Sequence, residues 1–247
     1  MNKKKIYNTI IENIKTIFGA LIIAIIIRSL IVQPFYIPSS SMEPTLLIGD
    51  RIFVSKYTYG ISKHSFPFSP KISDKRFIYK QPSRGDLVVF KTPADNRTDY
   101  IKRLIGLPGD EIQFIEGEIF INEKKIIRKE VNNITKIRCG KFLLDTIHYE
   151  ETLPNGKKYI AAYSKKGSIQ NTQKFKVPSN KFFLLGDNRD CSRDSRYLDS
   201  VGYVSYLNLV GKAQMIFFSN DTLSGSLLKF WNLPNSFRLK RTLKKIK

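Results

Sequence analysis

The sequence predicts a mainly β protein that is attached to a membrane by a single N-terminal helix. An apolar run lies near the N-terminus, and after Pro38 short apolar or alternating segments follow one another, separated by Gly, Pro or Asn residues. The chain has 247 residues, enough for one large β domain or two modest ones, and its 42% of hydrophobic residues excludes a mainly disordered protein. Two cysteines and two histidines are too few for a disulfide scaffold or a zinc cluster, so we expect no metal and no cofactor. The sequence leaves open whether Cys139 and Cys191 form a bridge.

The N-terminal apolar run is long enough to cross a membrane. Residues 16–27 read TIFGALIIAIII without a charge, and apolar residues on both sides extend this core to the roughly 20 residues that a span needs. We predict an anchor over residues 10–32, preceded by a short N-terminus over residues 1–9. A cleaved signal peptide is the alternative. The apolar run continues to Phe35 without the small residues of a cleavage site, which favours an uncleaved anchor.

Basic residues near the anchor predict its orientation. Lys3, Lys4, Lys5 and Lys15 precede the apolar core, and Arg28 alone follows it closely, so the N-terminus is expected in the cytoplasm and the remainder outside. The formal net charge of +21 favours anionic partners, either nucleic acid or acidic lipid. Export separates the basic domain from cytoplasmic nucleic acid. We therefore expect a single-pass protein of the cytoplasmic membrane that meets anionic lipid and no nucleic acid.

The part after the anchor reads as β structure with one irregular region. The segments of strand length are RIFVSK, DLVVFK, YIKRLIG, EIQFI, EIFIN, KFFLL and AQMIFF, and the turn Glu116-Gly117 predicts a hairpin between two of them. We expect a β core in two parts, residues 33–122 and 178–220. Residues 123–177 are polar and poorly patterned, which predicts a less regular second lobe or long loops. Residues 221–247 form a basic tail, expected to be solvated, with lipid contact as the alternative.

Two segments carry more specific residue combinations than a plain β domain needs. Residues 35–46 contain three serines; a linker is the plain interpretation, but large apolar residues flank this short stretch. In residues 99–110, Lys102 shares a strand face with Tyr100 and Leu104. A surface lysine with a snorkelling side chain is one interpretation. If Lys102 is buried, desolvation lowers its pKa and makes it a usable base.

The third notable segment is GDNRDCSRDSR, residues 186–196. Its alternating acids suggest a calcium loop, but Arg189 and Cys191 occupy would-be ligand positions and the turn glycine is missing. The plain interpretation is a polar turn held by its own Asp–Arg pairs. Such a turn also suits the positioning of hydroxyl groups around a site.

Together the three segments resemble those of bacterial type I signal peptidases (leader peptidases), the serine–lysine proteases that remove signal peptides from exported preproteins. The resemblance is strongest in PSSSMEPTLLIGD, in RGDLVVF through DYIKRLIGLPGD, and in GDNRDCSRDSR, which occur in the family's order. It implies an exported all-β catalytic domain with a smaller second β lobe. The sequence departs from the common pattern at Ser40, where glycine is frequent, and at Cys191, where asparagine is frequent.

The resemblance assigns roles to individual residues. It implies that Ser41 is the nucleophile, that Lys102 is the general base, and that the Ser39 hydroxyl and the Ser41 backbone N–H form an oxyanion hole. It also implies that Ser192 orients the lysine and that Asp194 and Arg196 form a supporting ion pair. Substrate-binding residues follow from the same resemblance: Phe35, Ile37, Met42, Leu46, Ile52, Val89, Tyr100 and Ile101. Ordinary core packing is the alternative for some of them, especially Val89.

The implied chemistry is physically consistent with the sequence. A serine hydroxyl is a weak nucleophile and needs an adjacent base, yet His64 and His148 both lie in polar, loop-like surroundings. A neutral lysine can replace histidine if burial lowers its pKa by several units. The expected substrates are preproteins, whose signal peptides end in small residues at alternate positions. An extended peptide presents those two side chains on one face, so two shallow apolar pockets suffice.

Rival interpretations remain at the level of the sequence. A self-cleaving repressor shares the serine–lysine chemistry, but the anchor argues against it. The motifs do not distinguish a signal peptidase from a conjugation-pilus processing peptidase. A comparison of general preproteins with a single pilin as substrates distinguishes the two enzymes. A non-catalytic basic scaffold that binds nucleic acid or acidic lipid accounts for the charge of +21, but the predicted export places the basic domain away from cytoplasmic nucleic acid.

Overall fold

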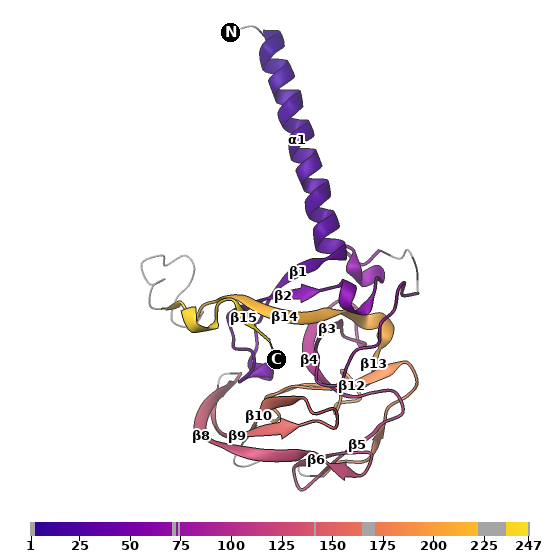
Figure 1. Cartoon of the computed structure of the whole chain (residues 1–247), viewed down its shortest axis with the longest axis vertical. Helices are drawn as coiled ribbons and strands as arrows, with labels where there is room; N and C mark the ends of the chain where they lie inside the picture. Colours follow the sequence, from indigo (N-terminus) through magenta and orange to yellow (C-terminus); the bar gives the residue numbers. More distant parts are fainter. Residues whose placement is uncertain are drawn as a thin grey trace.

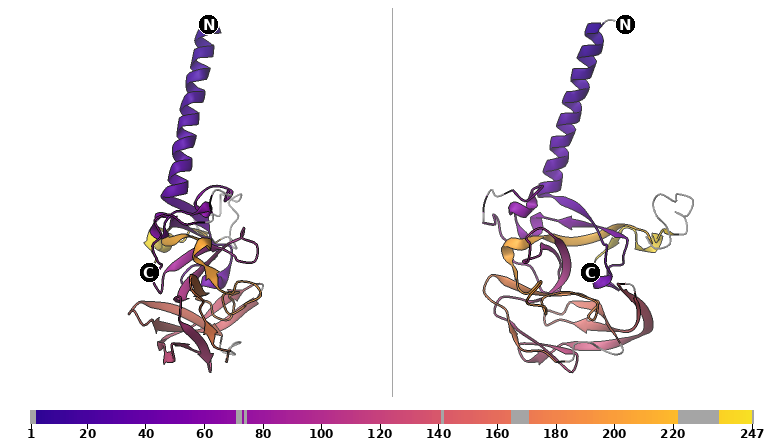
Figure 2. Two further views of the ribbon diagram at one scale, coloured as in Figure 1. Left: turned by 90° about the vertical axis from the view of Figure 1, so that its right-hand side faces the viewer. Right: turned by 180° about the vertical axis from the view of Figure 1, so that it is seen from behind.

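The computed structural model describes residues 3–70, 73, 75–140, 142–164, 171–221 and 236–246. Helix α1 (Lys3–Leu30) stands away from the β structure in every view (Figures 1 and 2). Its segment Tyr7–Leu30 is long and apolar enough to cross a membrane, and nearly all of its side chains are exposed. An exposed apolar helix is stable only in an apolar surrounding, so α1 is consistent with a membrane anchor. The helix ends at Leu30, two residues before the predicted end of the anchor, because the chain enters a strand at Val32.

The sheet nearest to α1 is antiparallel, with the order β1-β2-β14-β3-β4-β12-β13, and β15 pairs with β14. Its strands are β1 (Val32–Tyr36), β2 (Asp50–Ser55), β3 (Leu87–Lys91), β4 (Asp99–Gly106), β12 (Lys181–Leu185), β13 (Val204–Ser205), β14 (Leu209–Ser219) and β15 (Lys244–Lys245). The strands expected at RIFVSK, DLVVFK, YIKRLIG, KFFLL and AQMIFF are confirmed. Their side chains fill two hydrophobic clusters, one on each side of β3, around Val89 and around Phe90.

Two smaller sheets lie on the side away from α1 (Figures 1 and 2). One has the order β10-β9-β8 and the other β11-β5-β6-β7. Their strands are β5 (Glu111–Ile115), β6 (Glu118–Ile121), β7 (Lys124–Lys125), β8 (Ile127–Cys139), β9 (Phe142–Thr152), β10 (Lys158–Ser164) and β11 (Phe175–Lys176). The hairpin of β5 and β6 is confirmed, and Glu116 and Gly117 have positive φ at its turn.

The expected second β lobe over residues 123–177 is present, and its described part is more regular than the sequence predicted. Residues 127–139 and 142–152 form a long antiparallel ladder, and β10 extends it. Few of the described side chains of β8 and β9 are buried, so polar residues occupy most positions and hide the period-two pattern. Buried residues on both sides of the expected boundary at 122 share one hydrophobic cluster, which includes Phe114, Tyr159 and Phe183.

The expectation of a solvated C-terminal tail is wrong for residues 236–246. Lys244 and Lys245 pair with β14, the Ile246 side chain packs on the cluster around Val89, and Arg241 forms an ion pair with the buried Asp50 at 2.6 Å. Residues 222–235 and 247 of the predicted tail lie outside the described residues. Short 3₁₀ turns complete the described fold: η1 (Ser40–Met42), η2 (Tyr57–Tyr59), η3 (Lys63–Ser65), η4 (Tyr206–Asn208) and η6 (Leu239–Arg241).

Candidate active site

Ser41 and Lys102 meet beside the main sheet. Ser41 lies in η1, the turn that follows β1, and Lys102 lies in β4 opposite Val88 of β3. Lys102 Nζ donates to Ser41 Oγ at 2.7 Å. The Lys102 residue is only 3% exposed, and its ammonium nitrogen lies 5.4 Å from the centre of the Tyr100 ring. Lys102 is therefore a buried amine in contact with one hydroxyl, and the interpretation as a snorkelling surface lysine is wrong.

Burial changes the acidity of this amine. The pKa of Lys102 falls from 10.5 to about 8, mainly because desolvation disfavours the ammonium and further because Arg196 repels it. The carboxylates of Asp194 and Asp187 act in the opposite direction and limit the fall. At pH 7 a group with a pKa of about 8 is neutral in about one molecule in ten, which is sufficient for a catalytic base.

The serine turn is fixed by the loop that carries residues 186–196. The Asn188 backbone N–H donates to the Ser41 carbonyl at 3.2 Å, and the Asn188 side-chain amide donates to the Ser40 carbonyl at 3.1 Å. The Ser39 hydroxyl lies 3.4 Å from Ser41 Oγ, on the exposed side of the turn. The turn therefore presents two hydroxyls and a backbone N–H within a few ångströms of one another.

Asp194 and Arg196 form a buried two-point ion pair within this loop. Arg196 Nε donates to Asp194 Oδ1 at 2.8 Å and Arg196 Nη2 donates to Oδ2 at 2.9 Å, while Gly186 N–H also donates to Oδ2. Although burial opposes it, the charge of Arg196 lowers the pKa of Asp194, so the carboxylate stays ionised. The Ser192 hydroxyl is buried and lies close enough to Asp194 to contribute to this lowering. No hydrogen bond joins Ser192 to Lys102 within the described part of the chain.

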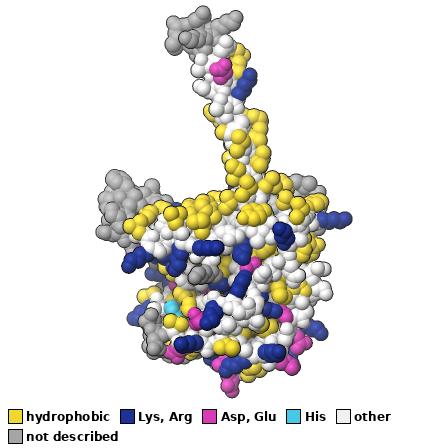
Figure 3. Space-filling view, viewed as in Figure 1, with side chains coloured by type: hydrophobic (Ala, Val, Ile, Leu, Met, Phe, Trp, Pro, Cys, Tyr) yellow, Lys and Arg dark blue, Asp and Glu magenta, His cyan; other side chains and the backbone are white. Residues whose placement is uncertain are grey.

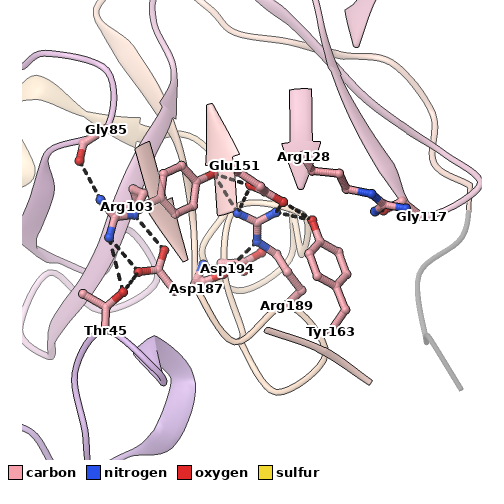
Figure 4. Close-up of polar contacts among 12 residues, drawn as sticks. Thr45, Gly85, Arg103, Gly117, Arg128, Glu151, Tyr163, Asp187, Arg189 and Asp194 are labelled. Carbon is pink, nitrogen blue, oxygen red and sulfur yellow. Dashed lines mark hydrogen bonds and ion pairs between the residues drawn. The ribbon is translucent and has the colours of Figure 1, made fainter. Parts of the chain in front are cut away.

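Another ion pair, not expected from the sequence, connects the same parts (Figure 4). Arg103, the neighbour of Lys102, donates to both oxygens of Asp187 at 2.8 and 2.7 Å, and Thr45 donates to Asp187 at 2.5 Å. Arg103 and Asp187 are almost completely buried. The pair therefore joins β4, the serine turn and the 186–196 loop. The sequence offered one signal for this pair. Arg103 directly follows the candidate base Lys102, and Asp187, of opposite charge, lies in the motif GDN.

The far side of the loop is fixed to the second sheet. Arg189 forms an ion pair with Glu151 of β9 at 2.8 Å, and the hydroxyl groups of Tyr159 and Tyr163 complete the network (Figure 4). A disulfide joins Cys139, the last residue of β8, to Cys191. The loop that touches Ser41 is thus fixed on one side by the main sheet and on the other by β8–β10.

A cavity of about 450 Å³ opens beside Ser41 and Lys102. Seven of the eight expected substrate-binding residues line it: Phe35, Ile37, Met42, Ile52, Val89, Tyr100 and Ile101. Leu46 does not line it; this side chain is fully buried in the cluster around Val89, where it packs beneath the cavity. Pro38, Cys191 and Arg193, which the sequence did not suggest, also line the cavity. The walls are predominantly apolar, so an uncharged extended peptide suits the cavity.

The two histidines lie elsewhere. His64 Nδ1 is within 3.0 Å of Ser69 Oγ, and His148 Nε2 is within 2.7 Å of Thr135 Oγ1. Neither has Ser41 as a partner in the described structure. Lys102 is therefore the base that the geometry offers to Ser41.

Comparison with known proteins identifies the family. The family model described as signal peptidase, peptidase S26, matches residues 10–218. The chain belongs to the signal peptidase family, peptidase S26. A protein named signal peptidase I from Rickettsia typhi is 42% identical over 91% of this chain and 89% of its own length, and one from Rickettsia prowazekii is 40% identical over 100% and 98%. A solved signal peptidase I from Enterococcus faecalis is 24% identical, with a TM-score of 0.33 over 54% of this chain and 97% of that chain. The residues of this signal peptidase that match the family model run from α1 into β14.

Proposed function

We propose that this chain is a signal peptidase I, a membrane-anchored serine endopeptidase that cleaves N-terminal signal peptides from preproteins by means of a Ser41–Lys102 dyad. The observation that supports this dyad most directly is the 2.7 Å contact between the buried Lys102 amine and the Ser41 hydroxyl, in a chain of the S26 family. The lowered pKa of Lys102 supports its role as a base near neutral pH.

The reaction begins with proton transfer from Ser41 Oγ to neutral Lys102 Nζ. Oγ attacks the scissile carbonyl carbon, and the carbonyl oxygen becomes an oxyanion. The Ser39 hydroxyl and the Ser41 backbone N–H donate to this oxyanion, each worth about 3 kcal/mol of transition-state stabilisation. As the C–N bond breaks, the Lys102 ammonium returns its proton to the departing amine, and the signal peptide remains bound to Ser41 as an ester.

Water completes the cycle. Lys102, neutral again, takes a proton from a water molecule that attacks the ester carbonyl. The bond to Ser41 Oγ breaks, Lys102 returns the proton to Oγ, and the signal peptide leaves with a new carboxylate. The charges of Asp194 and Arg196 act on the pKa of Lys102 in opposite directions: Asp194 raises it and Arg196 lowers it.

Substrate selection follows from the cavity and the strand order. β1 is an edge strand of the main sheet, so an extended peptide can align beside its unpaired backbone. Side chains two residues apart then face the same apolar wall, which includes Ile37, Met42 and Val89. Because large side chains such as Phe35, Met42 and Tyr100 line this cavity, we propose a preference for small residues at alternate positions before the cut.

The apolar helix supports a position of the site beside a membrane. α1 leads directly into β1, and hydrophobic side chains surround the foot of α1, with Lys and Arg side chains below them (Figure 3). We propose that residues 1–9 are cytoplasmic and that the domain lies on the opposite face, where it meets anionic lipids and preproteins. Residues 33–122 and 178–220 supply the catalytic groups, and residues 123–177 support them. A preprotein held in the same bilayer reaches the site at a raised effective concentration.

The direct experiment incubates the detergent-solubilised full chain with a preprotein and locates the cut by mass spectrometry. We expect a single cut after a small-x-small sequence at the end of the signal peptide. A panel of unrelated preproteins and a single pilin separates a general enzyme from a pilin-specific one. Absence of cleavage, or cuts at unrelated positions, contradicts the proposed function.

A further inference from the structure

A second cavity, of about 440 Å³, lies at the foot of α1. Its walls include Arg28 in the last turn of α1, the loop from His64 to Ser69, and Arg97. It shares Phe35 and Asp99 with the cavity beside Ser41, but neither Ser41 nor Lys102 lines it. Arg28 lies in the last turn of the apolar helix α1, at the end of the candidate membrane span. This cavity therefore lies at the level where the chain leaves the membrane.

The cavity has a surplus of positive charge. Arg28, Lys91 and Arg97 line it, against the single carboxylate of Asp99. Lys91 is paired with that carboxylate at 2.9 Å and also donates to the Arg97 carbonyl. The guanidinium groups of Arg28 and Arg97 have no acidic partner among the described residues. Two guanidinium groups beside one cavity form a site for an anion of fixed geometry such as a phosphate.

Burial and nearby positive charges lower the pKa values of two basic groups, His64 and Lys56. The pKa of His64 falls to about 4 through burial first and then through the charges of Lys63, Lys91, Arg76 and Lys56. The pKa of Lys56, behind the same wall, falls to about 8 through burial and then through Arg28 and Lys91, with Asp99 opposing. Several positive charges therefore lie close to the wall of this cavity.

The loop of the cavity also carries a fully exposed aromatic side chain. Phe68 is 103% exposed, and it lines the same cavity as the two free guanidinium groups. Phe68 and Ser69 both have positive φ, at 61° and 48°, a backbone conformation that non-glycine residues adopt at a cost. The turn therefore presents an exposed apolar ring beside a cavity lined by two arginines. An apolar tip beside cationic groups at a membrane surface is the combination that an anionic phospholipid satisfies.

We infer that this cavity binds the phosphate headgroup of one anionic phospholipid, held by Arg28 and Arg97, with Phe68 inserted among the acyl chains. The ligand bridges α1 and the domain, and it fixes the domain against the bilayer beside the cleft. This inference rests on the proposed function for the position of the domain beside anionic lipid and adds one specific headgroup site to it; its test involves neither Ser41 nor Lys102.

The test uses the full chain in nanodiscs with an indole introduced by Phe68→Trp, in a background where the one native tryptophan is removed by Trp231→Phe. Brominated phosphatidylglycerol or brominated phosphatidylcholine is added at the same low mole fraction, and quenching of the indole is measured. We expect clearly stronger quenching by the anionic lipid. Equal quenching by the two lipids overturns the inference.

Charge variants test which side chains hold the lipid. In the Phe68→Trp background, Arg97→Gln and Arg28→Gln should each lower the excess quenching about five-fold, the factor that corresponds to about 1 kcal/mol per basic side chain near an anionic surface. Lys80→Gln is the matched control, since it removes one charge from an exposed residue outside the cavity. Equal losses in all three variants indicate general surface attraction and contradict a site.

Two additions separate the lipid from other occupants. Inorganic phosphate at millimolar concentration should leave the excess quenching unchanged; its loss indicates a site for free phosphate and overturns the lipid assignment. A signal peptide added to the lipid-containing nanodiscs should also leave the excess unchanged. Displacement by the peptide shows that the cavity belongs to the substrate path, and this overturns the inference as well.

Discussion

Lys102 Nζ lies 2.7 Å from Ser41 Oγ although 61 residues separate the two in sequence. Lys102 lies in β4, inside the main sheet, and Ser41 lies in the turn after the edge strand β1. The contact depends on the 186–196 loop, which bonds to the carbonyls of Ser40 and Ser41 and places Asp194 near the amine. The geometry of the dyad is therefore a property of three distant segments that fold against one another.

The pH dependence of cleavage should follow the ionisation of Lys102. The neutral amine is the active form, so we expect kcat/KM to rise with pH and to level off above a midpoint near 8. Replacement of Arg196 by methionine removes a charge that lowers the pKa of Lys102, so the midpoint should move to higher pH. Initial rates with a peptide substrate between pH 6 and 10 give the midpoints. A wild-type midpoint near 10.5 contradicts burial as the source of the base.

Burial of Lys102 should also reduce stability. Its pKa is about 8 when folded and 10.5 when unfolded, so the unfolded chain binds the proton first as pH falls. The cost develops between pH 10.5 and 8, stays constant below 8, and amounts to about 3 kcal/mol. Lys102→Met should therefore raise the free energy of unfolding at pH 7 and give little gain at pH 11. Denaturant titrations at both pH values test this; a gain that is independent of pH points to packing instead.

The fold and the site were predictable to different degrees. The alternating segments identified the strands of the main sheet, because each buries one or both faces. β8 and β9 were not recognised, since their ladder places few side chains in a core. Leu46 illustrates what the sequence could not predict about the site. The motif indicates that this residue lies near the serine, but only the packing of the fold decides whether its side chain faces the cavity or the core. Arg103 and Asp187 could not be paired from sequence because 84 residues separate them.

Gly186 provides a test of the contact between the loop and the serine turn. A Cβ atom at this position lies 2.1 Å from Ser192 Oγ and 2.5 Å from the Ser41 carbonyl oxygen, so Gly186→Ala must displace one of the two segments. We expect a fall in kcat of at least 100-fold, as for other displacements of about 1 Å at a reacting centre. Gly109→Ala is the control: its Cβ meets nothing within 4 Å, and its positive φ costs only about 1 kcal/mol. Equal activity of both variants argues against tight contact at Gly186.

The disulfide between Cys139 and Cys191 should stabilise the loop more than it serves chemistry. It closes 52 residues of chain, which predicts a loss of about 4 kcal/mol on removal in the chain-entropy model. The double variant Cys139→Ser, Cys191→Ser should unfold at lower denaturant concentration and still cleave substrate slowly. Wild-type protein treated with dithiothreitol should match it, and the double variant should not respond to the reductant. Unchanged unfolding midpoints contradict this role.

Variants with matched controls test the assignment of the dyad. Ser41→Ala and Lys102→Met should each lower kcat by a factor on the order of 10⁶. Ser40→Ala is the control for the serine, because its hydroxyl has no hydrogen-bond partner in the described structure. Lys56→Met is the control for the lysine, since Lys56 is equally buried, has a pKa of about 8, and bonds to the Ser65 carbonyl instead of a serine hydroxyl. Both controls should retain cleavage, and loss of activity in either control weakens the assignment.

The central claim is that Ser41 forms a covalent bond to the signal peptide with Lys102 as the base. Rapid acid quenching of enzyme and preprotein, followed by digestion and mass spectrometry, tests it most directly. We predict that the fragment containing Ser41 gains the mass of an acyl group ending at the cleavage site, and that Lys102→Met shows no such adduct. An adduct on another residue, or cleavage at an undiminished rate by Ser41→Ala, contradicts the account.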